Sequence, residues 1–177
     1  MTLSSWWASA RERCVEQLAT PSPLLDALAC EAASVASSRS VHLAIFVEPF
    51  LTFVLEGTKS IESRFSMVRS APYRQVTSGD LVLLKQAGGP IIGACLVEAT
   101  WYFAKPDAAT RAAIRERFGQ ALRDDVPGFW DEREDAAYVS LFKLSHVGAL
   151  HRPITCPKQD RRGWVVLRDR QQLSLLV

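Results

Sequence analysis

The chain has 177 residues, 48% of them hydrophobic and 23% charged, which is enough for one hydrophobic core and a small appendage. A net charge of +2 is too small to indicate nucleic-acid binding by itself. No apolar run approaches the ~20 residues of a membrane helix, and the first residues lack the basic and apolar regions of a secretion signal. We therefore expect a cytoplasmic protein with no membrane partner.

The cysteines and histidines do not have the spacing of a metal site. Cys14, Cys30, Cys95 and Cys156 are far apart in apolar or helical contexts, and no Cys-x-x-Cys pair occurs. The three histidines also lack ligand spacing. We expect free buried thiols, no metal and no cofactor.

The first 40 residues indicate a helical extension. Apolar residues recur every three or four positions over residues 3–19, and a second such pattern covers about 22–37. We expect a helical hairpin over 1–40, followed by one domain over 41–177. Trp6 and Trp7 either pack onto that domain, which we favour, or form a surface for a protein partner.

The segment after the hairpin predicts a strand, a short helix and a second strand. Residues 41–47 are β-branched and aromatic, and Pro49 suits the start of a helix. Gly57 suits the left-handed residue that ends a short helix. From about Ser60 the chain extends, and the period of two places Glu62 and Arg64 on one face.

The rest of the chain reads as strands joined by glycine turns, with one helical interruption. We expect strands over 81–85, 91–103, 137–144, 147–155 and 164–167, and a helix over about 106–122. Pro153 indicates an edge position. The acidic run 131–135, after Phe129 and Trp130, predicts a solvated loop. Paired strands with such turns are typical of an antiparallel barrel.

The octapeptide 57–64 resembles the Gly-x-Lys-x-x-Glu-x-Arg signature of the ASCH domain, a relative of the PUA β-barrel, with Gly57, Lys59, Glu62 and Arg64 at the four positions. The flanks 47–50, 78–84, 138–141 and 152–154 also resemble the family. The resemblance covers about residues 41–168. It implies an α+β fold, a PUA-like and mostly antiparallel β-barrel with a helical insertion, here preceded by the helical hairpin.

That resemblance implies binding of RNA or a modified nucleoside in a cleft at the barrel mouth. In this interpretation Arg64 clamps a phosphate, while Glu62 accepts a hydrogen bond or acts as a base. Burial beside Arg64 would favour the neutral amine of Lys59, whereas pairing with Glu62 would keep it charged. The alternative is structural, with Glu62 and Arg64 paired to fix the barrel mouth.

A hydrolase is the second functional alternative. Its substrate would be RNA or an acylated pyrimidine nucleoside, with Lys59 and Glu62 as the acid–base pair. The amidohydrolase branch of the superfamily has a threonine where Glu62 stands, so its hydroxyl nucleophile is missing here. Tyr138 and Ser140 share a face of their strand and could line the same cleft.

A second set of candidate binding residues lies outside the octapeptide. Phe65 and Trp164, like Tyr73 and Trp101, could stack an unpaired base, although core packing is the default. Lys158, Arg161 and Arg162 precede Trp164 in a predicted loop. Residues 59–85 hold 5 basic and 2 acidic groups, and residues 145–177 hold 6 and 2. If these segments are neighbours in the barrel, they form one basic face.

Overall fold

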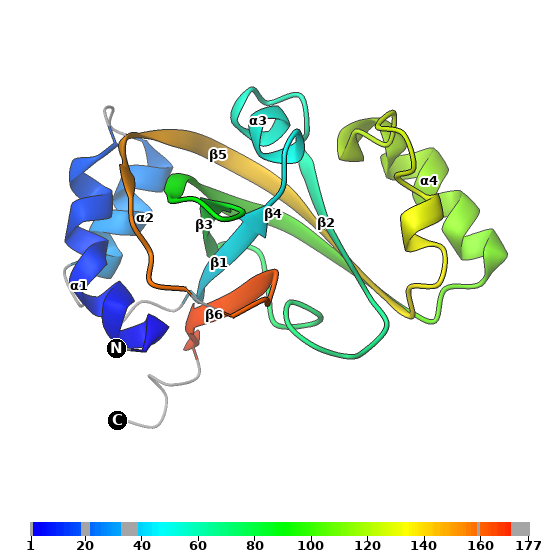
Figure 1. The fold of residues 1–177 in the computed structure, drawn as a ribbon, viewed down its shortest axis with the longest axis horizontal. Coiled ribbons are helices and arrows are strands. Elements are labelled where there is room, and N and C mark those ends of the chain that lie inside the picture. Colours follow the sequence, from blue (N-terminus) through cyan, green and yellow to red (C-terminus); the bar gives the residue numbers. More distant parts are fainter. Residues whose placement is uncertain (1, 19–21, 33–38, 159, 171–177) are drawn as a thin grey trace.

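One curled sheet of six strands organises the molecule, and β2 and β6 are the first and last strands of its order, β2-β5-β4-β3-β1-β6 (Figure 1). The computed structural model describes residues 2–18, 22–32, 39–158 and 160–170. The strands are β1 (Val41–Phe46), β2 (Ile61–Ser66), β3 (Leu81–Gln86), β4 (Ile91–Ala104), β5 (Tyr138–Ile154) and β6 (Trp164–Arg168). Only β1 and β3 pair in parallel among these pairs. The predicted mostly antiparallel sheet is therefore confirmed, in the form of a half-barrel.

Strand β5 is continuous where the sequence pattern predicted two strands. His146 interrupts the pattern because its φ of 49° is left-handed, and the register with β4 shifts on both sides of it. The pairing with β2 ends at Lys143, so the remainder of β5 pairs with β4 alone. Pro153 therefore lies in a stretch that has a strand partner on one side only, as expected, and the His151 amide on the other side donates to the Gln17 carbonyl of the hairpin.

A helical hairpin covers one end of the sheet. Helix α1 (Leu3–Glu16) is capped by Thr2, whose side chain accepts from the Ser5 amide, and α2 (Pro23–Ala32) packs beside it. Of the second helix predicted over about 22–37, residues 33–37 lie outside the described residues.

The hairpin shares its core with the sheet. Trp6 and Trp7 are each 3% exposed, in one cluster with Leu28, Leu43 and Leu83. Their burial favours packing onto the domain. The two rings are therefore not available as a contact surface for a protein partner, and the partner alternative would depend on other residues of the hairpin.

The opposite end of the sheet carries the predicted insertion (Figure 1). Helix α3 (Phe50–Leu55) precedes β2, and α4 (Ala108–Leu122) begins at Asp107, whose side chain accepts from the Thr110 amide. The acidic run forms a short 3-10 helix, η1 (Asp131–Arg133). Its acidic side chains are exposed as expected, but Arg133 turns inward over the Phe129 ring, 4.3 Å from its centroid. No helix in the described part of the chain is long and apolar enough to cross a membrane.

Candidate ligand-binding site

The octapeptide forms the turn between α3 and β2 and the first residues of β2. Gly57 has a φ of 75°, the left-handed conformation predicted for the end of the helix. The alternation along β2 then puts Glu62 and Arg64 on one face. Ile61 and Phe65 lie on the other face and pack in the cluster under α4. The predicted placement of both charges on one face is confirmed.

Lys59 is 2% exposed and holds two parts of the fold together. Its Nζ donates to the backbone oxygens of Ile61 at 2.7 Å and of Leu122 at 3.0 Å. Leu122 is the last residue of α4, where carbonyls lack helical partners and favour a positive charge. Burial lowers the pKa of Lys59, and the Glu62 carboxylate, 3.6 Å from Nζ, opposes that shift.

Arg64 bridges the open side of the half-barrel. Its Nε lies 2.8 Å from Oε1 of Glu62. Its Nη1 donates to the Gly163 carbonyl at 3.0 Å and its Nη2 to the Ile45 carbonyl at 2.9 Å. A Cβ on Gly163 would lie 3.1 Å from Nη1, so a glycine allows this close approach. The guanidinium therefore joins β2 to β1 and to the turn before β6.

Aromatic rings enclose the Arg64 guanidinium. It lies 5.2 Å from the centroid of Phe46 and 5.3 Å from that of Trp164. Trp164 is itself 3% exposed, and its Nε1 donates to Nδ1 of the buried His42. The predicted role of Trp164 in stacking a base is thus replaced in this structure by packing beneath Arg64.

These charged groups line a cavity of about 110 Å³. Arg133, Phe50 and Phe129 complete its wall, and Arg133 is the cation that sequence reasoning missed. With Lys59 and Arg64 it makes three cations in the lining, against the single carboxylate of Glu62. The lining therefore holds more cations than carboxylates, and Arg133 also pairs with the exposed Glu132 outside the lining, 3.1 Å from its Nη1. The sequence signal for Arg133 was slight, a single arginine behind two aromatic residues in an acidic run.

Tyr138 and Ser140 lie near this site but not in it. In the β2–β5 register they pair with Ser66 and Arg64, so they share the face of the charged residues as predicted. Ser140 is 2% exposed, and the Tyr138 ring packs against Tyr73 with centroids 4.9 Å apart. Neither residue lines the cavity.

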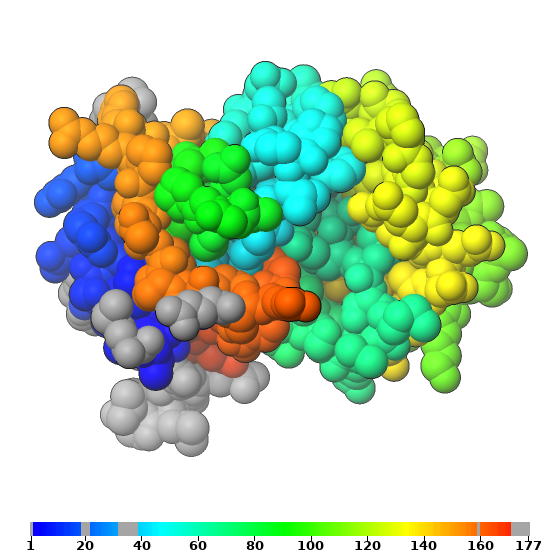
Figure 2. Space-filling model, viewed as in Figure 1, coloured from blue at the N-terminus to red at the C-terminus, as the bar shows by residue number. Residues whose placement is uncertain are grey.

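The cations before Trp164, which we call the second basic block, are Lys158, Arg161 and Arg162. They border the octapeptide site but do not line its cavity. Lys158 and Arg162 both pair with Asp160, and the hydrogen bonds from Arg162 and Lys158 hold the pKa of that carboxyl well below its usual range. Arg161 is exposed. Figure 2 shows this segment in orange beside the green turn of residues 87–90, and an open hollow of about 780 Å³ lies between them.

The other aromatic candidates, Phe65, Tyr73 and Trp101, lie in different parts of the fold and not around the octapeptide cavity. Phe65 faces α4 and lines a separate cavity, whereas Trp101 packs against Phe118 and Tyr73 is 6% exposed. Within the residues that the structure describes, no three histidine, cysteine or acidic side chains are arranged to hold a metal ion.

Comparisons with known proteins identify the fold. No family model matches the sequence, and no curated protein does. A solved structure of ASCH from Zymomonas mobilis matches 80% of this chain and 96% of its own, with a TM-score of 0.58 at 14% identity. This chain has the ASCH fold. Two mutant forms of the same protein match with TM-scores of 0.56 and 0.58, at 16% and 15% identity, each over 78% of this chain and over 97% and 96% of their own.

The ASCH fold expected from the octapeptide is thus confirmed, together with the α+β class. At 14–16% identity the similarity establishes the fold alone. Conclusions about a ligand depend on the residues of this chain, and above all on the cations around the octapeptide cavity.

Proposed function

We propose that the chain binds single-stranded RNA and places a backbone phosphate in the octapeptide cavity. The observation that carries this proposal is the surplus of positive charge from Lys59, Arg64 and Arg133 around a cavity whose one carboxylate, Glu62, is already paired with Arg64. A phosphate oxygen would accept from the remaining guanidinium N–H groups of Arg64 and Arg133. Lys59, whose ammonium already faces Ile61, Leu122 and Glu62, would contribute its positive charge.

The size of the cavity favours RNA over a free modified nucleoside. Its volume of about 110 Å³ is smaller than the roughly 300–1,000 Å³ of typical small-molecule pockets. It suits one group of a larger ligand. A strand that continues beyond the cavity would also meet the exposed Arg161 of the second basic block.

Arg133→Gln tests the proposal with little risk to the fold, because Arg133 is partly exposed and donates only to the Phe129 carbonyl and to the exposed Glu132 carboxylate among the described contacts. We expect the variant to bind labelled single-stranded RNA about tenfold more weakly, with a salt slope reduced by about one. Arg13→Gln is the matched control, since Arg13 is exposed on α1, at the other end of the sheet, and does not line this cavity. Equal binding by wild type and Arg133→Gln would contradict the proposal.

RNA cleavage is a second candidate, supported by the convergence of the three groups that it needs. Glu62 lies 2.8 Å from Arg64 and 3.6 Å from Lys59, whose pKa is lowered by burial. Glu62 would take the proton of the attacking 2′-hydroxyl, Arg64 would hold the phosphate, and Lys59 would protonate the leaving oxygen.

The same binding gel distinguishes the two candidates. If wild type cleaves the RNA and the Glu62→Gln variant does not, although both proteins unfold at the same urea concentration, the result supports a hydrolase. Intact RNA throughout leaves a binding protein. An acylated pyrimidine nucleoside belongs in the same panel, and its hydrolysis would support the amidohydrolase alternative despite the missing threonine.

A further inference from the structure

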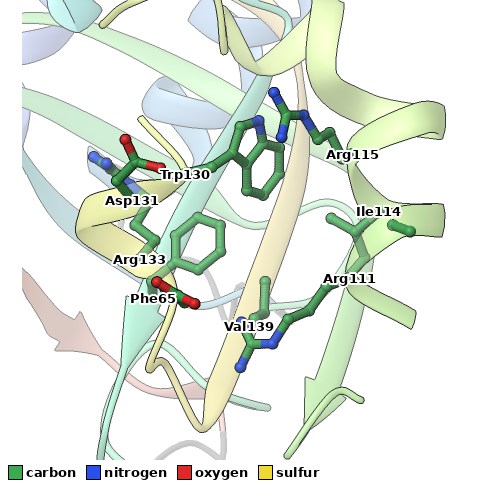
Figure 3. Close-up of a pocket in the computed structure, with 10 residues that line it drawn as sticks. Phe65, Arg111, Ile114, Arg115, Trp130, Asp131, Arg133 and Val139 are labelled. Carbon is green, nitrogen blue, oxygen red and sulfur yellow. The ribbon is translucent and has the colours of Figure 1, made fainter. Parts of the chain in front are cut away.

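A second cavity, of about 340 Å³, lies between α4, η1 and the face of the sheet opposite to Glu62 and Arg64. Figure 3 shows the rings of Phe65 and Trp130 on one side of it and Ile114, Arg111 and Arg115 of α4 on the other. Its volume is within the range of small-molecule pockets, which is roughly 300–1,000 Å³. Arg133 lines both cavities, so the two are neighbours.

The aromatic wall of this cavity is held in a fixed orientation. Trp130 Nε1 donates to Oδ2 of Asp124 at 2.8 Å. The indole ring meets Phe65 edge to face at 6.1 Å and Phe129 at 5.0 Å. Trp130 and Phe65 are nevertheless only half-buried, so part of each ring remains available to a planar ligand.

The charge of the cavity lining favours an anion. Arg111, Arg115 and Arg133 line it, against the exposed carboxylates of Asp131 and Glu134. Arg133 already pairs with Glu132 at 3.1 Å. In the described part of the chain, no ion pair within 4.0 Å involves Arg111 or Arg115. Arg111 donates to the Ala136 carbonyl, and Arg115 lies 5.7 Å from the centroid of Trp130.

We infer that this cavity is a nucleotide subsite, in which a base stacks on Trp130 and its phosphate faces Arg111 and Arg115. Aromatic faces and guanidinium groups that have no carboxylate partner together match a planar ring that carries an anion. The inference rests on the proposed function, because the bound unit would be the neighbour of the nucleotide whose phosphate occupies the octapeptide cavity. Arg133 lines both cavities, so two successive nucleotides of one strand could occupy them side by side.

The test is titration of the ¹⁵N-labelled full chain with adenosine 5′-monophosphate, observed at the indole N–H of Trp130. We expect that signal, assigned with Trp130→Phe, to shift at saturation. Arg115→Gln should raise the apparent Kd about tenfold. Arg117→Gln is the matched control, because Arg117 is an exposed arginine of the same helix that lies over Trp101 and Phe118 and does not line the cavity. Adenosine and inorganic phosphate, added alone, should each bind more weakly.

The outcomes separate this inference from the proposed function. A Trp130 shift with the nucleotide, weakened by Arg115→Gln only, supports the subsite even if Arg133→Gln leaves RNA retention unchanged and so contradicts the phosphate cavity. No shift with nucleotide or RNA overturns the subsite even if RNA is retained. Equal weakening by Arg115→Gln and Arg117→Gln also overturns it, since the binding would then reflect general charge.

Discussion

Helices cover both ends of the sheet, but they cover them in opposite ways. At the α1–α2 end, tryptophan and leucine side chains fill the space, and Trp6, Trp7 and Leu28 are almost completely buried. At the α4 end, arginines and half-buried aromatic rings leave two cavities. The first end is therefore a filled core, which we expect to contribute mainly to stability, whereas the second end contains the cavities in which we propose that a ligand binds.

The largest expected effect tests the stabilising end. Leu28→Ala removes a side chain with no exposed surface from the hairpin core, and we expect it to lower the free energy of unfolding by about 2–5 kcal/mol. Urea denaturation measures this change. Leu25→Ala, on the same helix but half-buried, should cost clearly less. RNA binding by the folded Leu28→Ala protein should be unchanged, and its loss would contradict the division between the two ends.

The second prediction concerns alkaline pH. Burial raises the pKa of the Cys14 thiol from 9.0 to about 12. The folded state thus keeps a proton that the unfolded state releases, so stability falls as pH rises above 9.0. Over two pH units above that value, wild type should lose about 2–3 kcal/mol more than Cys14→Ala. Urea midpoints measured at each pH compare the two. Parallel curves would show that the thiol is not held neutral.

The third prediction concerns the α4 end, where the lysine of the octapeptide responds to pH with the opposite sign. Burial lowers the pKa of Lys59 from the ordinary lysine value of 10.5. As pH rises toward that value, the side chain therefore loses its positive charge earlier than an exposed lysine does. The folded state then releases the proton first, and this residue adds stability as pH rises through that interval.

RNA binding should weaken over the same interval, by up to about tenfold, because a phosphate loses one cation. Lys59→Arg should bind with much less pH dependence, since guanidinium stays charged. Binding gels from about pH 7 to about pH 10 follow the change. Circular dichroism checks that the larger side chain is accommodated. Identical pH profiles for the two proteins would remove Lys59 from the ligand contacts.

The smallest expected effect is at the second basic block. Arg161 is exposed, so Arg161→Gln should change the free energy of unfolding by less than about 0.5 kcal/mol. It should weaken RNA binding uniformly across sequences and reduce the salt slope by at most about one. Arg162→Gln is the informative companion, because Arg162 is already paired with Asp160 and should matter less. The reverse order would show that the Asp160 pairs open on binding.

Local patterns made much of this molecule predictable. The left-handed Gly57, the common face of Glu62 and Arg64, and the insertion helix after Asp107 all follow from backbone preferences and periods within a few residues. Local patterns also explain the wrong prediction of two strands, 137–144 and 147–155, in place of β5. The pattern breaks at His146, whose backbone is left-handed, and a local break of this kind cannot be told from a turn between two strands.

The site depended on contacts that no local pattern contains. The Lys59–Leu122 hydrogen bond spans 63 residues, and the Arg64–Gly163 bond spans 99. Arg133 was missed because the acidic residues around it predicted a solvated loop, whereas its contacts with the Phe129 ring and carbonyl and with the Phe65 ring turn it inward. Parallel pairing of β1 with β3 is likewise a property of the whole sheet.

Lys59 also has a consequence for how variants of this protein are interpreted. Its ammonium group donates to the carbonyl of Leu122 at the end of α4, the helix that carries Arg111 and Arg115. The same group contributes charge to the octapeptide cavity. A phosphate that draws this ammonium away from the Leu122 carbonyl would alter the end of that helix. The two cavities would then be thermodynamically linked, and by reciprocity a nucleotide beside Trp130 would change the affinity for phosphate at Lys59 by the same factor. Replacing Lys59 would thus remove the hydrogen bond to the end of α4 as well as a cation of the octapeptide cavity.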